Sequence, residues 1–194
     1  MSSKNKRVNK NLSIKTKDSL INNTIKLVSE VGLKASTSEI SKMSNVAAGT
    51  LFVHFKNKEE LISNTYFSIK DELQNRLNKE INFDDTPENI CKEVFVFMGN
   101  FYINRPREFK FVMFTEQDPM FSNKSFAKSK EYDSALELFI KDLEKNNIIK
   151  KGSREQVFGA AWALLKYFIS FNIENKVREL TKIQIAMLWD TIKA

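Results

Sequence analysis

Residues 36–58 read STSEISKMSNVAAGTLFVHFKNK, and this stretch decides how the N-terminal part of the chain folds. Ser36 stands three positions before Glu39, which is the spacing of a capping box. In that motif the serine accepts a backbone N–H and the glutamate reaches back to the cap. The spacing predicts a helix from Thr37. Asn45 tolerates a left-handed backbone, so the helix is expected to end there in a sharp turn.

A second short helix is predicted after this turn. Leu51 and Phe55 lie four positions apart and are expected to face inward together with Val46. The opposite face is small and almost uncharged, and it consists of Ala47, Ala48, Gly49, Thr50, Val53 and His54. A glycine inside a helix costs about 1 kcal/mol relative to alanine. This face therefore indicates close approach to something outside the chain, as in a helix-turn-helix that enters a DNA groove.

A third helix is predicted from Lys58, because Asn57 and Glu60 repeat the capping spacing. Lys58 places a cation in the first turn, where it opposes the helix dipole, so a DNA phosphate is a natural partner for it. The apolar face of this helix continues through Ile62, Tyr66, Ile69, Leu73 and Leu77. The helix is therefore expected to join the N-terminal part to the rest of the chain without a flexible linker.

From Lys17 to Leu61 the chain resembles the N-terminal domain of the TetR (tetracycline-repressor-type) family of bacterial transcriptional regulators. The resemblance rests on the order of Gly32, the capped helix, the turn, Gly49-Thr50-Leu51-Phe52, His54-Phe55 and Lys58-Glu59. It implies DNA contacts by Ser36, Thr37, Ala47, Ala48, Gly49, Thr50, Phe52, Val53, His54 and Lys58. His54 either makes such a contact or is a surface imidazole without a function.

Three features depart from the usual family pattern. The usual glycine of the turn is Asn45 here, and the loop after Gly32 is one residue shorter. The usual tyrosine that grips a phosphate is Phe52, which cannot donate a hydrogen bond.

The positive charge is concentrated near the helix-turn-helix. The chain has a net charge of +7. Residues 1–62 hold 11 Lys+Arg and 5 Asp+Glu, a net of +6, whereas the remaining 132 residues hold 20 and 19, a net of +1. A positive patch supplies the salt-dependent phosphate term of DNA affinity. The basic residues before Asp18 either solubilise a disordered tail or form an arm that contacts DNA.

Cysteine, histidine and hydropathy exclude several classes of protein. Cys91 is the only cysteine, which excludes an intrachain disulfide and fits a reducing cytoplasm; it is either a small apolar filler or a redox sensor. No apolar stretch approaches 18 residues and the N-terminus lacks an apolar signal core, so a cytoplasmic protein with no membrane association is expected. His54 is the only histidine, so neither a metal site, a cofactor nor a catalytic residue is expected.

The rest of the chain is predicted to be helical, because no period-two stretch of useful length occurs. An apolar face of Leu20, Leu27 and Val31 defines the first helix, which Gly32 ends. Later helices are predicted from Thr86 to Arg105, over 108–116, over 123–146, and after the caps Ser153 and Thr181. The expected architecture is all-α, with a three-helix DNA-binding domain at 1–62 continuous with a helical effector-binding and dimerisation domain at 63–194.

Aromatic residues are concentrated in the middle of the chain. Nine of the 16 phenylalanines lie between Phe95 and Phe139. They either form the core of the bundle or surround an apolar ligand cavity. The resemblance implies a small, largely apolar effector in the bundle, with Glu93, Phe97, Asn100, Phe101, Tyr102, Phe114, Glu116, Tyr132, Phe139 and Trp162 as candidate lining residues.

The last two helices are apolar on more than one side, which indicates either a large core or a partner. The resemblance implies a homodimer through a four-helix bundle. The candidate interface residues are Trp162, Leu165, Ile169, Ile173, Ile185, Leu188, Trp189 and Ile192. The sequence thus predicts a dimeric, effector-released repressor of a palindromic double-stranded DNA operator. Alternatives are a helical interaction module whose basic end binds an anionic surface, and a helical-bundle enzyme.

Overall fold

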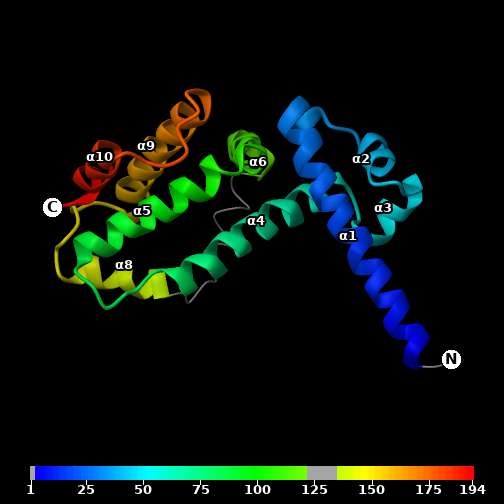
Figure 1. Ribbon diagram of the computed structural model, residues 1–194, viewed down its shortest axis with the longest axis horizontal. Coiled ribbons are helices and arrows are strands. Elements are labelled where there is room, and N and C mark those ends of the chain that lie inside the picture. The colour runs from blue at the N-terminus through cyan, green and yellow to red at the C-terminus, as the bar shows by residue number, and fades with distance from the viewer. Residues whose placement is uncertain (1–2, 122–134) are drawn as a thin grey trace. The chain divides into compact units, whose positions relative to one another are not determined.

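The structure is a computed structural model that describes residues 3–121 and 135–194. In chain order its elements are α1 (Ser3–Val31), the 3₁₀ turn η1 (Gly32–Lys34), α2 (Thr37–Met43), α3 (Ala48–His54), α4 (Lys58–Glu80), α5 (Pro87–Ile103), α6 (Pro106–Gln117), α8 (Ala135–Lys145), α9 (Arg154–Glu174) and α10 (Lys182–Ile192) (Figure 1). Over the described ranges, the strand-like pairing is limited to an isolated bridge between Ile149 and Lys193. The predicted all-α fold is confirmed.

The helices group into two compact units. The first unit comprises Met1–Lys70 with Arg107–Lys128, and the second comprises Asp71–Pro106 with Ser129–Ala194. This division differs from the expected boundary after residue 62, because α6 packs with the N-terminal helices. Side chains of α6 contact Gly32, Tyr66 and Lys70 of the first unit. Helix α4 contributes residues to both units.

Helix α1 begins earlier than expected. Its predicted start was near Lys17, but the helix extends back to Ser3. Leu12 and Ile14 are exposed, and burial in the core begins at Leu20. Val31 was expected on the apolar face, yet half of it is exposed, because the helix ends there and the chain turns at Gly32 with φ +70. The core of the first unit includes Leu20, Val28, Ile40, Leu51, Phe55, Leu61 and Ile62.

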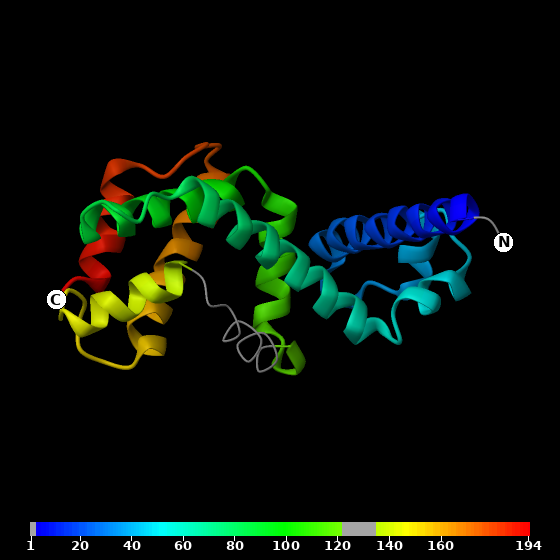
Figure 2. The ribbon, with the colours of Figure 1, turned by 90° about the horizontal axis from the view of Figure 1, so that it is seen from below.

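In the second unit, α5, α9 and α10 pack on one another (Figure 2). Gly99 of α5 lies against Leu180, so closely that a Cβ atom added to the glycine would lie 2.6 Å from Leu180 Cδ1. Asn100 Oδ1 accepts a hydrogen bond of 3.1 Å from the backbone N–H of Leu180. The close approach of α5 to the segment between α9 and α10 therefore requires a glycine.

A buried pair of amides joins α9 to α10. Asn172 Nδ2 donates to Gln184 Oε1 at 3.2 Å, and Gln184 Nε2 donates to Asn172 Oδ1 at 2.9 Å. Asn172 is fully buried and Gln184 is 8% exposed. Because buried polar groups are costly when unpaired, this exchange favours one pairing of the two helices over others.

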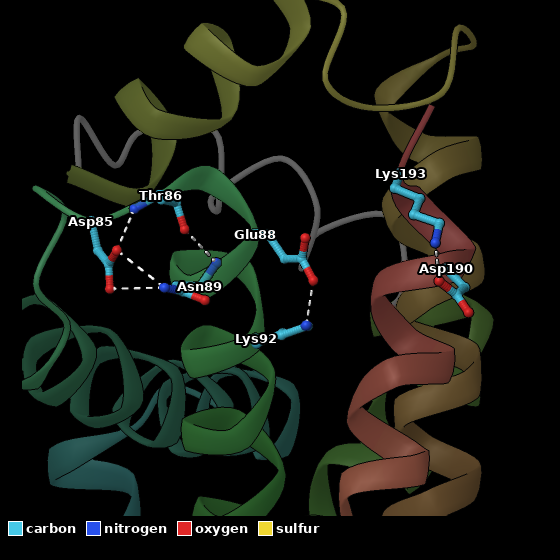
Figure 3. Close-up of polar contacts among 7 residues, drawn as sticks. All are labelled: Asp85, Thr86, Glu88, Asn89, Lys92, Asp190 and Lys193. Atoms are coloured by element: carbon cyan, nitrogen blue, oxygen red, sulfur yellow. Dashed lines mark hydrogen bonds and ion pairs between the residues drawn. The ribbon is translucent and has the colours of Figure 1, made fainter.

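Predicted caps begin three helices of the second unit. Ser153 with Gln156 and Thr181 with Gln184 form complete capping boxes. Thr86 caps α5, with Pro87 at its first position. The Asp85 carboxylate accepts hydrogen bonds from the Thr86 backbone and the Asn89 side chain, which lower its pKa (Figure 3). These local pairings fix where the helices start.

The helix expected over 123–146 is only partly within the described residues. Its described part is α8, which ends at a turn with Asn147 at φ 54. The helix expected over 108–116 is α6, which begins two residues earlier at Pro106 because proline suits the first helical position.

Cys91 is buried in α5, and burial raises the pKa of its thiol to about 12. A redox sensor needs an accessible thiol of lowered pKa. Cys91 therefore fits the role of an apolar filler.

Candidate nucleic-acid interface

The capping box predicted at Ser36 is present. Ser36 Oγ accepts from the Glu39 backbone N–H at 3.1 Å, and Glu39 Oε2 accepts from the Ser36 backbone N–H at 3.2 Å. Ser36 Oγ also donates to Glu39 Oε2 at 2.7 Å. These bonds hold the pKa of Glu39 below its usual value, and Thr37 begins α2 as predicted.

The turn after α2 has the geometry that Asn45 permits. Asn45 has φ 59, the left-handed region. The backbone N–H of Val46 donates to Ser41 O, and that of Asn45 donates to Lys42 O, both at 3.1 Å. This pair of bonds is a Schellman motif, usually built on glycine. The asparagine that replaces the usual family glycine therefore preserves the turn.

Side chains of α1 anchor this turn. Asn23 Nδ2 donates to Ser44 Oγ at 3.2 Å, and Ser44 Oγ donates to the carbonyl oxygen of Ser19 at 3.4 Å. Ser44 is buried, so the bonds are shielded from water. Nothing in the sequence pattern singles out these residues; the available signal is that Asn23 is a polar residue beside apolar positions of α1.

The buried and exposed sides of α3 are those that the sequence predicted. Leu51 and Phe55 are buried, with exposed fractions of 0% and 1%. On the other side, Val53 is 81% exposed and Phe52 is 53% exposed. Ala47, Ala48 and Gly49 are also exposed, whereas Thr50 and His54 are partly buried. A Cβ atom added at Gly49 would find no atom within 4 Å, so packing within the chain does not require this glycine.

Two residues predicted to contact DNA have partners within the chain. Lys58 Nζ donates to the carbonyl oxygen of Leu33 at 2.6 Å. The Lys58 cation therefore has a partner in η1 without any external anion. The Ser36 hydroxyl is likewise used by Glu39. The ammonium group has two further donors, so a phosphate contact by Lys58 stays a prediction.

Exposed lysines flank the helix-turn-helix. Lys34 follows α1, Lys42 lies in the last turn of α2, and Lys56 follows α3; all three are exposed. A shallow hollow of about 460 Å³ lies between α2 and the start of α3, and it is lined by Ser38, Ser41, Lys42, Asn45, Val46 and Ala48. The surface next to the outer face of α3 is thus polar and basic, which suits a polyanion.

Residues 20–65, which include this helix-turn-helix, match the family model described as bacterial regulatory proteins, tetR family. The match to that family covers 46 of the 194 residues of the chain. The "Uncharacterized HTH-type transcriptional regulator YhgD" of Bacillus subtilis (strain 168) is 30% identical over 69 residues, or 35% of this chain and 36% of that protein. The match thus spans about a third of the relative's length. The family description names regulatory proteins, and the name of the relative specifies a transcriptional regulator of the helix-turn-helix (HTH) type.

Solved structures share the fold over most of the chain. A TetR family transcription regulator from Marinobacter aquaeolei VT8 has a TM-score of 0.83 and 13% identity, with 95% of this chain and 98% of that chain covered. A TetR-family transcriptional regulator from Haemophilus influenzae Rd has a TM-score of 0.72 and 21% identity, with 92% and 97% covered. At these identities the likeness concerns the fold.

Several residues of the predicted ligand pocket lie close together in the structure. Phe101 and Tyr102 of α5 have ring centroids 5.1 Å apart, and Tyr102 lies 6.1 Å from Trp162 of α9. Phe97 and Phe139 pack against the same buried cluster of Leu77, Ile90 and Val94. These five predicted lining residues lie in the second unit, on α5, α8 and α9.

The other predicted pocket residues are not part of these aromatic contacts. Phe114 and Glu116 are on α6 in the first unit, where Glu116 accepts a hydrogen bond of 3.1 Å from Tyr66. Asn100 Oδ1 accepts a hydrogen bond from the backbone N–H of Leu180. Glu93 is exposed. Tyr132 lies outside the described residues. Sequence periodicity could not assign these positions, because it does not show which helix side faces which neighbour.

The predicted dimer residues are mostly inside the protomer. Leu165, Ile169, Leu188, Trp189 and Ile192 are buried in the single chain, because these sides of α9 and α10 pack inward. Trp162, Ile173 and Ile185 are partly buried. The opposite sides carry exposed Tyr167, Phe171, Ile183 and Met187, a set called here the α9–α10 outer face. Both α9 and α10 are apolar on two sides. The residues predicted from the sequence for the dimer interface lie mostly on the inner side.

Proposed function

We propose that this chain is a homodimeric, ligand-responsive transcription regulator that represses from a palindromic DNA operator and is released by a small, largely apolar effector. The outer face of α3 carries the proposal. It presents Val53 and Gly49 to solvent on a helix-turn-helix whose inner side is buried. Stability alone does not favour an exposed glycine or an exposed valine on a surface helix, whereas such small, uncharged residues let a helix enter a groove.

The α9–α10 outer face supports the homodimer. Tyr167 and Phe171 are 61% and 44% exposed, and Ile183 and Met187 are 74% and 47% exposed. Tyr167 and Phe171 lie one turn apart with ring centroids 6.4 Å apart. Contiguous exposed apolar side chains mark interaction surfaces. A two-fold dimer also presents two copies of α3, as a palindrome requires.

A cluster in the second unit supports an apolar effector. Leu77, Ile90 and Val94 form a small buried centre. The side chains packed around it remain partly exposed, and they are Ile81, Phe83, Phe97, Met98, Leu136 and Phe139. Small-molecule sites are lined mostly by apolar side chains, and these residues could supply such a lining. The proposed effector therefore binds among the end of α4, α5 and α8.

Helix α4 is the proposed route of regulation. Its first residue, Lys58, bonds to η1, and its later residue Leu77 belongs to the apolar cluster. An effector that displaces α4 would alter the spacing of the two reading helices and lower operator affinity. By linkage, DNA must weaken effector binding by the same factor. Equal effector affinity with and without operator would contradict this mechanism.

A mobility-shift titration against the DNA that flanks the gene for this chain tests the core of the proposal. We expect retention of one duplex over a random duplex, with an affinity that falls steeply as salt rises. Equal affinity for the two duplexes at all salt concentrations would refute the proposal.

A further inference from the structure

Helix α3 lacks the side chains that usually read bases by paired hydrogen bonds. Between Val46 and Phe55 the sequence contains no Arg, Lys, Asn, Gln, Asp or Glu. Arg and Lys bind guanine, Asn and Gln bind adenine, and carboxylates accept from cytosine. Reading of bases by α3 must therefore depend on another chemistry.

Apolar groups dominate the part of α3 that faces outward. Val53 is 81% exposed and lies on the side of the helix away from the buried Leu51. Gly49 and Thr50 precede it by four and three positions, so they lie beside it on the same face. Gly49 has no side chain, and Thr50 carries a methyl group next to its hydroxyl. A groove wall could thus approach Val53 without obstruction.

We propose that α3 recognises thymine through its 5-methyl group, with Val53 as the central contact and Thr50 beside it. This inference rests on the proposed function, because it assumes that α3 enters the major groove. In that groove the thymine methyl is an apolar group that distinguishes A·T from the other pairs, and apolar side chains contact it. Packing Val53 against that methyl removes apolar surface of both partners from water.

The surroundings of α3 favour DNA over a protein as the occupant of this apolar face. Residues 1–62 have a net charge of +6, and Lys42 and Lys56 are exposed on either side of α3 in the sequence. An apolar face on a segment of net positive charge is suited to a polyanion whose groove presents methyl groups, which is the major groove of A·T-rich DNA.

The test begins by selecting a duplex from a random library with the full-length chain. Each thymine of the selected half-site is then replaced, one at a time, by deoxyuridine, which lacks only the 5-methyl group. At the thymine that Val53 contacts, we expect the Kd to rise about fourfold, the factor for one methyl-sized apolar contact. The salt dependence is expected to stay the same, because no charge changes.

Two variants assign the effect to Val53. In Val53→Ala the valine methyl groups are lost, so deoxyuridine at that position should no longer change the Kd. The fold is expected to persist, because Val53 is exposed and alanine favours helix. Leu138→Ala is the matched control: Leu138 is 61% exposed on α8, and this variant should keep the full deoxyuridine effect.

The outcomes distinguish a failure of thymine-methyl recognition from a failure of the proposed function. Sequence-specific binding that no deoxyuridine substitution changes would overturn methyl reading and leave the proposed function intact. A deoxyuridine effect that persists unchanged in Val53→Ala would overturn the assignment to Val53. A selection that recovers no preferred sequence would overturn both the proposed function and this inference.

Discussion

Two helical surfaces of this chain expose apolar side chains, and they differ in the size of those side chains. Apart from Phe52, the outer face of α3 consists of small residues, Val53 with alanines and a glycine, and exposed lysines precede and follow the helix. The α9–α10 outer face instead consists of large side chains, including Tyr167 and Phe171. Neither face is needed to fold the chain, since both point away from the core.

The difference in size indicates a difference in partner. Small side chains let a helix backbone approach a groove, and the lysines supply affinity for phosphates. Large rings and aliphatic chains bury much more area per residue and are enriched at the centres of protein interfaces. The first face therefore suits DNA, and the second suits another copy of the chain.

Leu165→Ala should have the largest effect on stability. It tests whether this side of α9 is buried within the protomer or lies at the dimer interface. Leu165 is 1% exposed, so the truncation leaves a cavity in the protomer. We expect the free energy of unfolding to fall by about 3 kcal/mol. Urea denaturation at several protein concentrations checks this, and Ala163→Ser at an exposed position of the same helix serves as a control. A loss that vanishes at high protein concentration would place Leu165 at the dimer interface instead.

Phe171→Glu tests the proposed use of the α9–α10 outer face. A charge in an apolar interface is costly, so the dimer Kd should rise at least about thirtyfold. The secondary structure should be unchanged, because Phe171 is 44% exposed in the single chain. Sedimentation equilibrium measures the dissociation, with Leu138→Glu on α8 as the control. An undiminished dimer would show that the helices pair through another surface.

Gly49→Ala should separate stability from DNA binding. The added methyl meets no atom of the chain, so the free energy of unfolding should rise by about 1 kcal/mol. The same methyl should weaken operator binding about tenfold, the scale of one lost base contact. Gly159→Ala is a matched control, because Gly159 also has no atom within 4 Å of an added Cβ. Unchanged DNA affinity in Gly49→Ala would argue against close approach at this position.

Lys58→Gln and Lys58→Met distinguish a phosphate contact from a structural bond. Both variants remove the charge, so a phosphate contact predicts that the salt slope of DNA binding falls by about one unit in each. Only methionine lacks a donor for the carbonyl of Leu33, and it should lower the free energy of unfolding by about 1 kcal/mol. An unchanged salt slope in both variants would show that Lys58 only joins α4 to η1 by a hydrogen bond.

Low pH should weaken the capping box at the start of α2. This is the smallest of the expected changes in stability. The hydrogen bonds from Ser36 lower the pKa of Glu39, so this contribution is present above the unfolded pKa, near 4.5, and is lost as pH falls through the folded pKa. Glu39→Gln should remove this pH dependence and keep the box, since Gln156 and Gln184 serve in the other two boxes. An NMR titration of Glu39 checks the direction. A midpoint at or above 4.5 would contradict it.

Features that depend on neighbours in the sequence could be predicted. The three capping boxes and the left-handed Asn45 each involve residues within five positions of one another. The outward side of α3 could also be predicted, because Leu51 and Phe55, four positions apart, mark the buried side. Helix α1 was harder to delimit, since its polar first half carries no periodic apolar signal.

Contacts between distant residues could not be predicted in the same way. The bond from Lys58 to Leu33 spans 25 positions and the bond from Leu180 to Asn100 spans 80. In each case the structure shows a partner within the chain for a side chain to which the sequence analysis assigned an external partner. The sequence supplies the donor or acceptor, but packing decides which group it meets.

The sequence by itself determined the all-α class, the helix-turn-helix and the face of α3 that is available to DNA, because short-range capping and periodicity specify them. The tertiary structure alone decided which side of α9 and α10 is buried, and so which side is left for a partner. Both sides of these helices are apolar, and only packing against α5 fixes their orientation. It also decided that α6 packs with the N-terminal helices, a choice that no local pattern encodes.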